Sequence, residues 1–174
     1  MKIYDCFMYF DEEVVVDVRL NTLNNFVDYF VIVESRFTHK GDARELKFNH
    51  KKFEKFKDKI IYIVDEQTYP QIRKINKEDS KIKKSNKSIF NAACRENGQR
   101  NLISKGLEGA NKEDFIMISD VDEIPKLSGL NFNSLNEKII LFKVNPVSDK
   151  SSTNKTLLKS LFSAKELISL ANIN

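Results

Sequence analysis

The chain has 174 residues, 41% of them hydrophobic and 31% charged, a composition that excludes a chain disordered throughout. A chain of this length buries about 70% of its unfolded surface, which is enough for one domain with a substantial core. The 29 basic and 25 acidic residues leave a formal net charge of only +4, and no apolar run is long enough to span a bilayer.

The first residues and the cysteines indicate a soluble protein of a reducing compartment. The start, MKIYDCFMYF, carries acidic and aromatic residues where a signal peptide needs an uninterrupted apolar core. Cys6 and Cys94 lack metal-ligand spacing, so we expect two buried free thiols. We therefore predict a soluble, cytoplasmic protein.

The basic excess gathers in residues 73–87, which we call the basic segment. Seven basic residues stand there against two acidic ones, and the resulting charge of +5 accounts for the whole surplus of the chain. No aromatic residue is interleaved with the lysines and no nucleic-acid motif accompanies them, so no nucleic-acid partner is expected. A solvated loop or an exposed helix face is the favoured interpretation, and contact with an anionic ligand is the alternative.

In chain order, short apolar runs alternate with amphipathic segments. Strands are predicted at residues 3–10, 28–34, 59–64, 115–118 and 138–144. Helices are predicted at 12–26, with Asp11 as the N-cap, at 51–57 and at 88–107, whereas 65–87 is expected to be the least ordered part. This order specifies an α/β fold with a mostly parallel sheet flanked by helices.

The composition changes after Asp149, where Ser, Thr, Asn and Lys predominate. The leucine spacing of residues 157–170 then predicts a helix-like segment. We therefore expect one domain over residues 1–149, followed by a polar linker and a helix-like tail over 150–174.

A cluster of carboxylates follows the apolar run 115–118. Asp120, Asp122 and Glu123 crowd one short turn, where three like charges repel unless a divalent cation or a basic ligand group compensates them. Ligands of open α/β sheets sit outside the carboxyl ends of the strands, and this cluster lies at such an end. The sequence therefore predicts a metal site at Asp120 and Asp122, supported by Glu123. A solvated turn is the alternative.

The same edge of the sheet offers further polar groups. Asp11, Glu34 and Ser35 follow or end the first two predicted strands and are candidate contacts for the base and ribose of a nucleotide, although Glu34 could also be a solvated strand end. The loop that starts at Ser35 has no period, and binding residues concentrate in such loops. The chain contains no Walker loop and no Gly-x-Gly-x-x-Gly, so a metal at Asp120 and Asp122 would have to hold a diphosphate.

Four blocks of the sequence, IYDCFMYFDE, DYFVIVESRFTHKG, RENGQRN and ISDVDEIP, together resemble glycosyltransferase family 17. The resemblance implies a GT-A-like fold of the nucleotide-diphospho-sugar transferases, with residues 1–149 as the nucleotide-sugar-binding domain. It further implies a UDP-GlcNAc-type donor and an inverting transfer to a glycan hydroxyl, assisted by Mn²⁺ or Mg²⁺. The family's polar block maps to Glu96, Gln99, Arg100 and Asn101, and Arg100 is the member best suited to grip a phosphate.

Two other functions stay open at this stage, and no catalytic base is assigned. A non-catalytic nucleotide-sugar or metal-binding module is one, because the chain has no Trp and few aromatic residues follow Phe115 to form a wall for the acceptor glycan. On that ground we expect donor binding with weak transfer by this chain alone. A haloacid-dehalogenase-like phosphatase is the other, since it also places Asp-x-Asp after an apolar strand.

Overall fold

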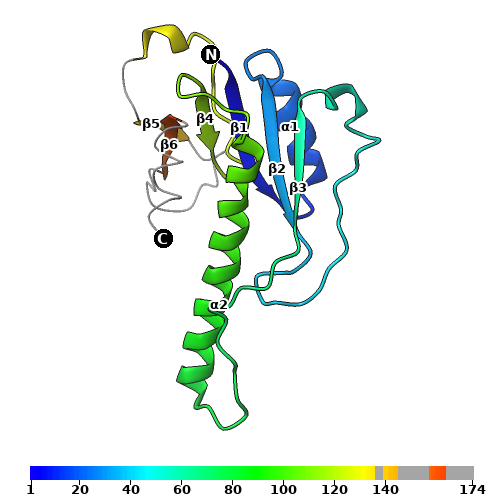
Figure 1. Ribbon diagram of the computed structural model, residues 1–174, viewed down its shortest axis with the longest axis vertical. Coiled ribbons are helices and arrows are strands. Elements are labelled where there is room, and N and C mark those ends of the chain that lie inside the picture. The colour runs from blue at the N-terminus through cyan, green and yellow to red at the C-terminus, as the bar shows by residue number, and fades with distance from the viewer. Residues whose placement is uncertain (136–138, 145–156, 164–174) are drawn as a thin grey trace, which may run out of the picture.

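The computed structural model describes residues 1–135, 139–144 and 157–163. Within these residues the strands form a single sheet in the order β3-β2-β1-β4-β6-β5 (Figure 1). Its parallel part consists of β1 (Ile3–Tyr9), β2 (Tyr29–Ser35), β3 (Ile60–Asp65) and β4 (Phe115–Ile118). The α/β fold with a mostly parallel sheet and flanking helices is thereby confirmed.

The strand order reverses its direction at β1. The chain moves outward from β1 to β2 and β3 and then returns to place β4 on the other side of β1. Such a reversal separates the connections that leave the two neighbouring strands and opens a crevice at their carboxyl ends. The crevice of this sheet therefore lies between the ends of β1 and β4, beside the predicted carboxylate cluster.

The remaining strands are β5 (Ile139–Val144) and β6 (Leu157–Ser163), and β6 runs antiparallel to both β4 and β5. The sequence predicted β5 correctly. It was wrong for the start of the 157–170 segment, which is a strand instead of a helix, because a short run rich in leucine fits both periods and the open edge of β4 provides hydrogen-bond partners. Residues 164–170 lie outside the described residues, and the domain division at residue 149 stays a prediction.

Helices cover both faces of the sheet. The first face packs against α1 (Glu13–Leu23) and the 3₁₀ turn η1 (Glu54–Phe56), in a core that includes Phe7, Leu20 and Phe30. The second face packs against the 3₁₀ segment η2 (Leu102–Leu107), in a core that includes Val31 and Leu102. A further 3₁₀ turn, η3, spans Phe132–Ser134. Because side chains alternate between the two faces of a strand, each buried strand contributes to both cores.

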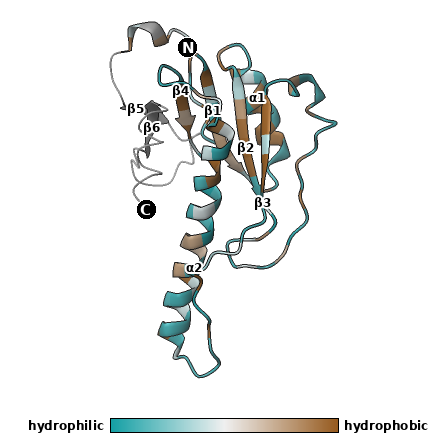
Figure 2. Cartoon of the chain, viewed as in Figure 1, coloured by the Kyte–Doolittle hydropathy of each residue, from teal (hydrophilic) through white to brown (hydrophobic). Residues whose placement is uncertain are grey.

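The long helix α2 (Lys81–Asn101) begins earlier than the predicted start at residue 88. Ser80 is its N-cap and accepts a hydrogen bond from the backbone N–H of Lys83 at 3.3 Å. Lysine is a good helix former, and the second half of the basic segment is an exposed helix, one of the two forms favoured for it, although residues 65–87 were expected to be the least ordered part of the chain. Figure 2 shows hydrophobic residues concentrated in the central strands and hydrophilic residues over most of α2.

Two smaller expectations also change. The N-cap of α1 is Glu12 rather than Asp11, and the Glu12 carboxylate accepts the backbone N–H groups of Phe10 and Asp11. Both cysteines are free thiols as predicted, but only Cys6 is fully buried and Cys94 is partly exposed. Burial raises the pKa of the Cys6 thiol well above its usual value. In the part of the chain that the structure describes, no helix combines the length and the apolar character needed to cross a membrane.

Gly106 in η2 allows this segment to approach the sheet closely, and its replacement tests the packing of the second face. A Cβ atom at this position would stand 2.4 Å from Cγ1 of Val31 and 3.2 Å from Cδ1 of Ile63. We expect Gly106→Ala to lower the free energy of unfolding by about 1–3 kcal/mol, because neither side chain can move within a filled core. Urea denaturation measures the change.

Gly109→Ala is the matched control, since nothing lies within 4 Å of a Cβ atom at that position. Its free energy of unfolding should stay close to that of the wild type. Equal stabilities of the two variants would show that η2 does not press against β2.

Candidate functional site

A cavity of about 830 Å³ opens at the carboxyl edge of the parallel strands. Five segments line it: residues 8–10 and Glu12 at the end of β1, Ser35 at the end of β2, residues 37–40 and Asp42 of the following loop, Glu96, Gln99 and Arg100 of α2, and residues 120–122 after β4. The volume lies within the range of sites for small molecules and cofactors. The position agrees with the crevice that the reversed strand order creates.

Arg19 of α1 fixes the shape of residues 119–123, which we call the acidic turn. Its Nη1 donates to the backbone carbonyl oxygens of Asp120 at 2.9 Å, Val121 at 3.1 Å and Glu123 at 3.1 Å. Its Nη2 donates to Oγ of Ser119 at 2.6 Å. One guanidinium therefore holds the backbone of the whole turn and leaves the carboxylate side chains to point elsewhere.

The charge of Arg19 is balanced by Asp5 in the middle of β1. Nε and Nη2 of Arg19 donate to the two carboxylate oxygens of Asp5 at 2.8 and 2.7 Å, and neither side chain is exposed to solvent. The guanidinium also lies over the ring of Phe7 at 4.7 Å from its centroid. A two-pronged, fully hydrogen-bonded pair of this kind compensates the desolvation of both charges.

Sequence reasoning missed Asp5 and Arg19, although each carries a readable signal. Asp5 interrupts an otherwise apolar strand, and Arg19 stands on the face of α1 that also carries the buried Val16 and Leu23. A charged residue is almost never buried without a partner. The negative charge on the first apolar element and the positive charge on the next could therefore have been predicted to form a pair.

The three predicted metal-site residues do not play equal parts. Asp120 and Asp122 are exposed and line the cavity. Glu123 is buried, and its Oε2 accepts the backbone N–H of Asp120 at 2.9 Å. The Glu123 carboxylate therefore braces the acidic turn from inside, which is a supporting role.

This arrangement fits a divalent cation that brings other ligands with it. No cluster of three or more His, Cys, Asp or Glu side chains able to hold a metal exists among the described residues. Mg²⁺ is commonly held by one or two carboxylates together with substrate phosphates and water. Asp120 and Asp122 supply such a pair, so a cation here would have to complete its coordination with a phosphate-bearing ligand.

The end of α2 reaches the acidic turn through Arg100. Its Nη2 lies 3.3 Å from Oε1 of Glu96 and 3.4 Å from Oδ1 of Asp120, and all three side chains line the cavity. Gln99 has a different task, because its Nε2 donates to the backbone carbonyl oxygen of Val33 at 2.9 Å and ties α2 to β2. Asn101 is exposed. Within the polar block, Glu96, Gln99 and Arg100 thus line the cavity, and Gln99 also anchors α2 to β2.

The predicted contacts at the first two strand ends are only partly brought together. Ser35 lines the cavity, but Asp11 does not, and its neighbour Glu12 lines it instead. Glu34 is fully buried and also lies outside the cavity. The side chain of Glu34 at the end of β2 points to the side of the sheet that is covered by other residues, and therefore away from the cavity.

Glu34 instead holds the segment 44–48 against the sheet. Its carboxylate accepts the backbone N–H groups of Lys47 at 2.6 Å and Phe48 at 3.1 Å, and it pairs with Nη1 of Arg44 at 3.0 Å. The hydroxyl of Tyr62 donates to it at 2.7 Å. Burial, together with this hydrogen bond to Glu34, raises the pKa of Tyr62 well above its usual value.

The cavity is acidic. Among its described lining residues, five carry carboxylates and two carry permanent positive charges, namely Lys40 and Arg100. An anionic ligand such as a diphosphate would meet net repulsion unless a cation accompanied it. The lining and the exposed Asp120 and Asp122 therefore favour the same chemistry, an anion that is bound together with a divalent cation.

Replacing Arg19 tests whether the acidic turn depends on the buried pair. We expect Arg19→Met to lower the free energy of unfolding by about 3–5 kcal/mol, because Asp5 and three turn carbonyls would lose their buried partner. Urea denaturation followed by circular dichroism measures the loss.

Arg36→Met is the matched control, since Arg36 forms an exposed ion pair with Glu66 at 2.7 Å. Its cost should stay below about 1 kcal/mol. If the two variants lost equal stability, the buried pair would not be what holds the turn.

Comparison with known proteins places these residues in a family. The family model described as glycosyltransferase family 17 matches residues 1–139, which include every candidate residue discussed above. The chain is similar to the "Beta-1,4-mannosyl-glycoprotein 4-beta-N-acetylglucosaminyltransferase" of Homo sapiens and Rattus norvegicus, with 32% identity over 124 residues, and of Mus musculus, with 31%. These matches cover 69% of the chain and 21% of each relative, so the matched part spans about a fifth of the length of the relatives. No solved structure matches the chain.

Proposed function

Because this chain belongs to glycosyltransferase family 17, we propose that it transfers a sugar from a nucleotide-diphosphate donor to a hydroxyl group of a glycan. One observation carries the proposal: the acidic turn presents Asp120 and Asp122 to an acidic cavity at the switch point of a parallel sheet. The protein supplies two carboxylates to a cation, and the phosphates of the donor would complete the coordination of that cation.

As the donor we propose UDP-GlcNAc. The names of the mammalian relatives describe transfer of N-acetylglucosamine to a mannosyl glycoprotein, and the same class of donor is proposed here. The parallel sheet with an Asp-x-Asp turn after β4 is consistent with a GT-A-like fold, and we propose that the transfer is inverting. An inverting transfer needs a carboxylate base that accepts the proton of the attacking hydroxyl.

The residues of the cavity divide the task of holding the donor. Asp120 and Asp122 would hold Mn²⁺ or Mg²⁺, which when bound would neutralise the charge that develops on the leaving diphosphate. Arg100 already stands between Glu96 and Asp120 and can turn its guanidinium to a phosphate oxygen. Arg19 and Glu123 keep the turn in place from the buried side, so that the two aspartates need no rearrangement when the ligand arrives.

Asp122→Asn tests the metal site. We expect the variant to lose the Mn²⁺-dependent binding of UDP-GlcNAc, because one of two protein ligands loses its charge. Its thermal midpoint without ligand should stay the same or rise slightly, since a repulsive charge is removed from the turn. Isothermal titration with UDP, UDP-GlcNAc and UDP-glucose, with and without Mn²⁺, measures donor class and metal dependence together.

Asp11→Asn is the matched control, because Asp11 is an exposed carboxylate at the same sheet edge but outside the cavity. It should bind the donor as the wild type does. If Asp122→Asn bound UDP-GlcNAc with Mn²⁺ as tightly as the wild type, the metal site would lie elsewhere. Hydrolysis of a simple phosphate ester without any sugar donor would point to a phosphatase instead.

Arg100→Lys tests the contact with phosphate separately from the metal. Lysine keeps the positive charge but cannot offer two parallel hydrogen bonds to phosphate oxygens. We expect the affinity for UDP in the presence of Mn²⁺ to fall roughly ten- to hundredfold, in line with the strength of hydrogen bonds to charged groups. The Mn²⁺ dependence itself should persist. Unchanged affinity would place the diphosphate away from α2.

A further inference from the structure

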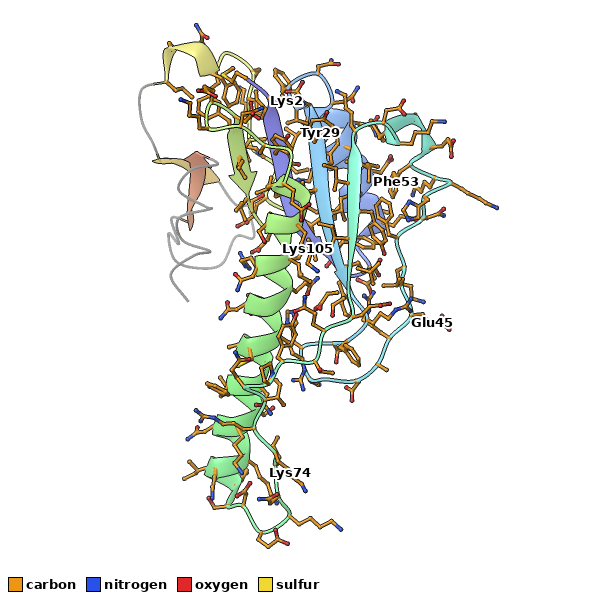
Figure 3. All side chains as sticks on the ribbon, viewed as in Figure 1. Lys2, Tyr29, Glu45, Phe53, Lys74 and Lys105 are labelled. Carbon is orange, nitrogen blue, oxygen red and sulfur yellow. The ribbon has the colours of Figure 1, made fainter. Side chains whose placement is uncertain are left out.

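A strongly basic surface lies at the opposite end of α2. The loop residues 73–80 and the helical residues 81–90, together called the basic arm, project away from the sheet (Figure 1). Figure 3 shows Lys74 on this arm, far from Tyr29 of β2 and from Lys2, which precedes β1. The arm carries the whole net positive charge of the chain and contributes no residue to the cavity.

The basic arm is an ordered structure. Asn91 holds the loop against the helix, since its Oδ1 accepts the backbone N–H of Arg73 and its Nδ2 donates to the carbonyl oxygen of Arg73, both at 2.8 Å. The guanidinium of Arg73 lies over the ring of Phe90 at 3.7 Å from its centroid. Nζ of Lys87 donates to the carbonyl oxygen of Lys74 at 2.8 Å and to Asp79 at 2.5 Å. Contacts within the arm therefore hold the side chains of Arg73 and Lys87 in fixed positions.

The outer face of the arm combines these charges with exposed isoleucines. Ile82 is 75% exposed and Ile89 is 66% exposed, and Ile75 in the loop is also exposed. Ile82 and Ile89 are seven residues apart and therefore share one face of the helix. Lys81 and Lys83 flank that face and are exposed. Ile82 and Ile89 belong to neither core and do not line the cavity.

We propose that the basic arm docks on the surface of an anionic phospholipid bilayer. The lysines would meet the negative headgroups, and Ile82 and Ile89 would enter the boundary between headgroups and acyl chains, as the apolar face of a membrane-surface helix does. Charge complementarity selects this occupant, because the arm alone carries a net +5. The proposal does not depend on which sugar the cavity accepts.

Other partners fit the surface less well. A second copy of the chain would bring an equal positive charge against the arm and be repelled. A single-stranded nucleic acid would use aromatic side chains for base stacking, but the aromatic residue of the arm, Phe90, lies under Arg73. In a complex with a nucleic acid, the exposed isoleucines would also meet charged phosphates and find no apolar surface to contact.

Co-sedimentation of the full chain with phospholipid vesicles tests the proposal. The protein should bind vesicles that contain about 30% phosphatidylserine and should bind pure phosphatidylcholine vesicles far less, since the neutral surface lacks the attracting potential. Raising the salt concentration from about 0.1 M to about 1 M should weaken binding by screening the lysines. Equal binding to both kinds of vesicle would overturn the electrostatic part of the proposal.

Two variants locate the surface. Each lysine near an anionic membrane contributes about fivefold in affinity, so the triple variant Lys74→Gln, Lys77→Gln, Lys81→Gln should bind roughly a hundredfold more weakly. The double variant Ile82→Ser, Ile89→Ser should also bind at least about tenfold more weakly, because it removes the inserted apolar groups. All five side chains are exposed, and circular dichroism should show unchanged folding.

The matched control is the triple variant Lys47→Gln, Lys51→Gln, Lys105→Gln, which removes the same charge from exposed positions outside the arm. It should retain most of the binding. An equal loss in this control would show attraction by net charge alone and overturn the proposal. So would tighter binding to a labelled RNA or DNA duplex than to vesicles, or a dimer that the isoleucine variant abolishes. The titration of UDP with Mn²⁺ should be the same in both arm variants, so failure here leaves the proposed transferase function untouched.

Discussion

The buried pair of Arg19 and Asp5 is the constraint on which the site depends. It joins three elements that are distant in sequence, since Asp5 belongs to β1, Arg19 to α1, and the carbonyl groups that Arg19 also binds to the turn after β4. A guanidinium can serve a carboxylate and several carbonyl oxygens at once because its donors lie in a fixed plane. The backbone of the acidic turn is thus fixed from the buried side, while Asp120 and Asp122 remain exposed.

The topology of the sheet explains why so many polar groups meet at one edge. Because β2 and β4 lie on opposite sides of β1 and run parallel to it, the loops after all three strands emerge at the same end and diverge. The resulting cavity is rich in carboxylates, which suits an anionic donor only when a cation is bound with it. Family membership and local electrostatics therefore support the same kind of ligand.

The helix α2 serves both ends of the molecule. Its C-terminal turns are tied to β2 by Gln99 and present Arg100 to the cavity. Its N-terminal half leaves the sheet and is stabilised by contacts with its own preceding loop, including those of Asn91 and Arg73. A segment that appeared irregular from its many lysines is helical because the Ser80 cap and these local contacts compensate for the missing core.

The sequence by itself determined the five N-terminal strand positions, the α/β class and the place of the Asp120 and Asp122 pair, because burial imposes apolar runs and a turn after a buried strand is exposed. It could not tell which polar side chains face the cavity. Glu34 and Glu123 look like ligand groups along the chain, yet both are buried. Glu34 binds backbone N–H groups of residues 47 and 48, which only the tertiary structure brings to it, whereas Glu123 turns back to the N–H of Asp120 within its own turn. Likewise, residues 157–163 form a strand because they pair with the free edge of β4, which their leucine pattern could not predict. Local sequence patterns show which residues are buried, but polar groups that are distant along the chain become hydrogen-bond partners only once the chain has folded.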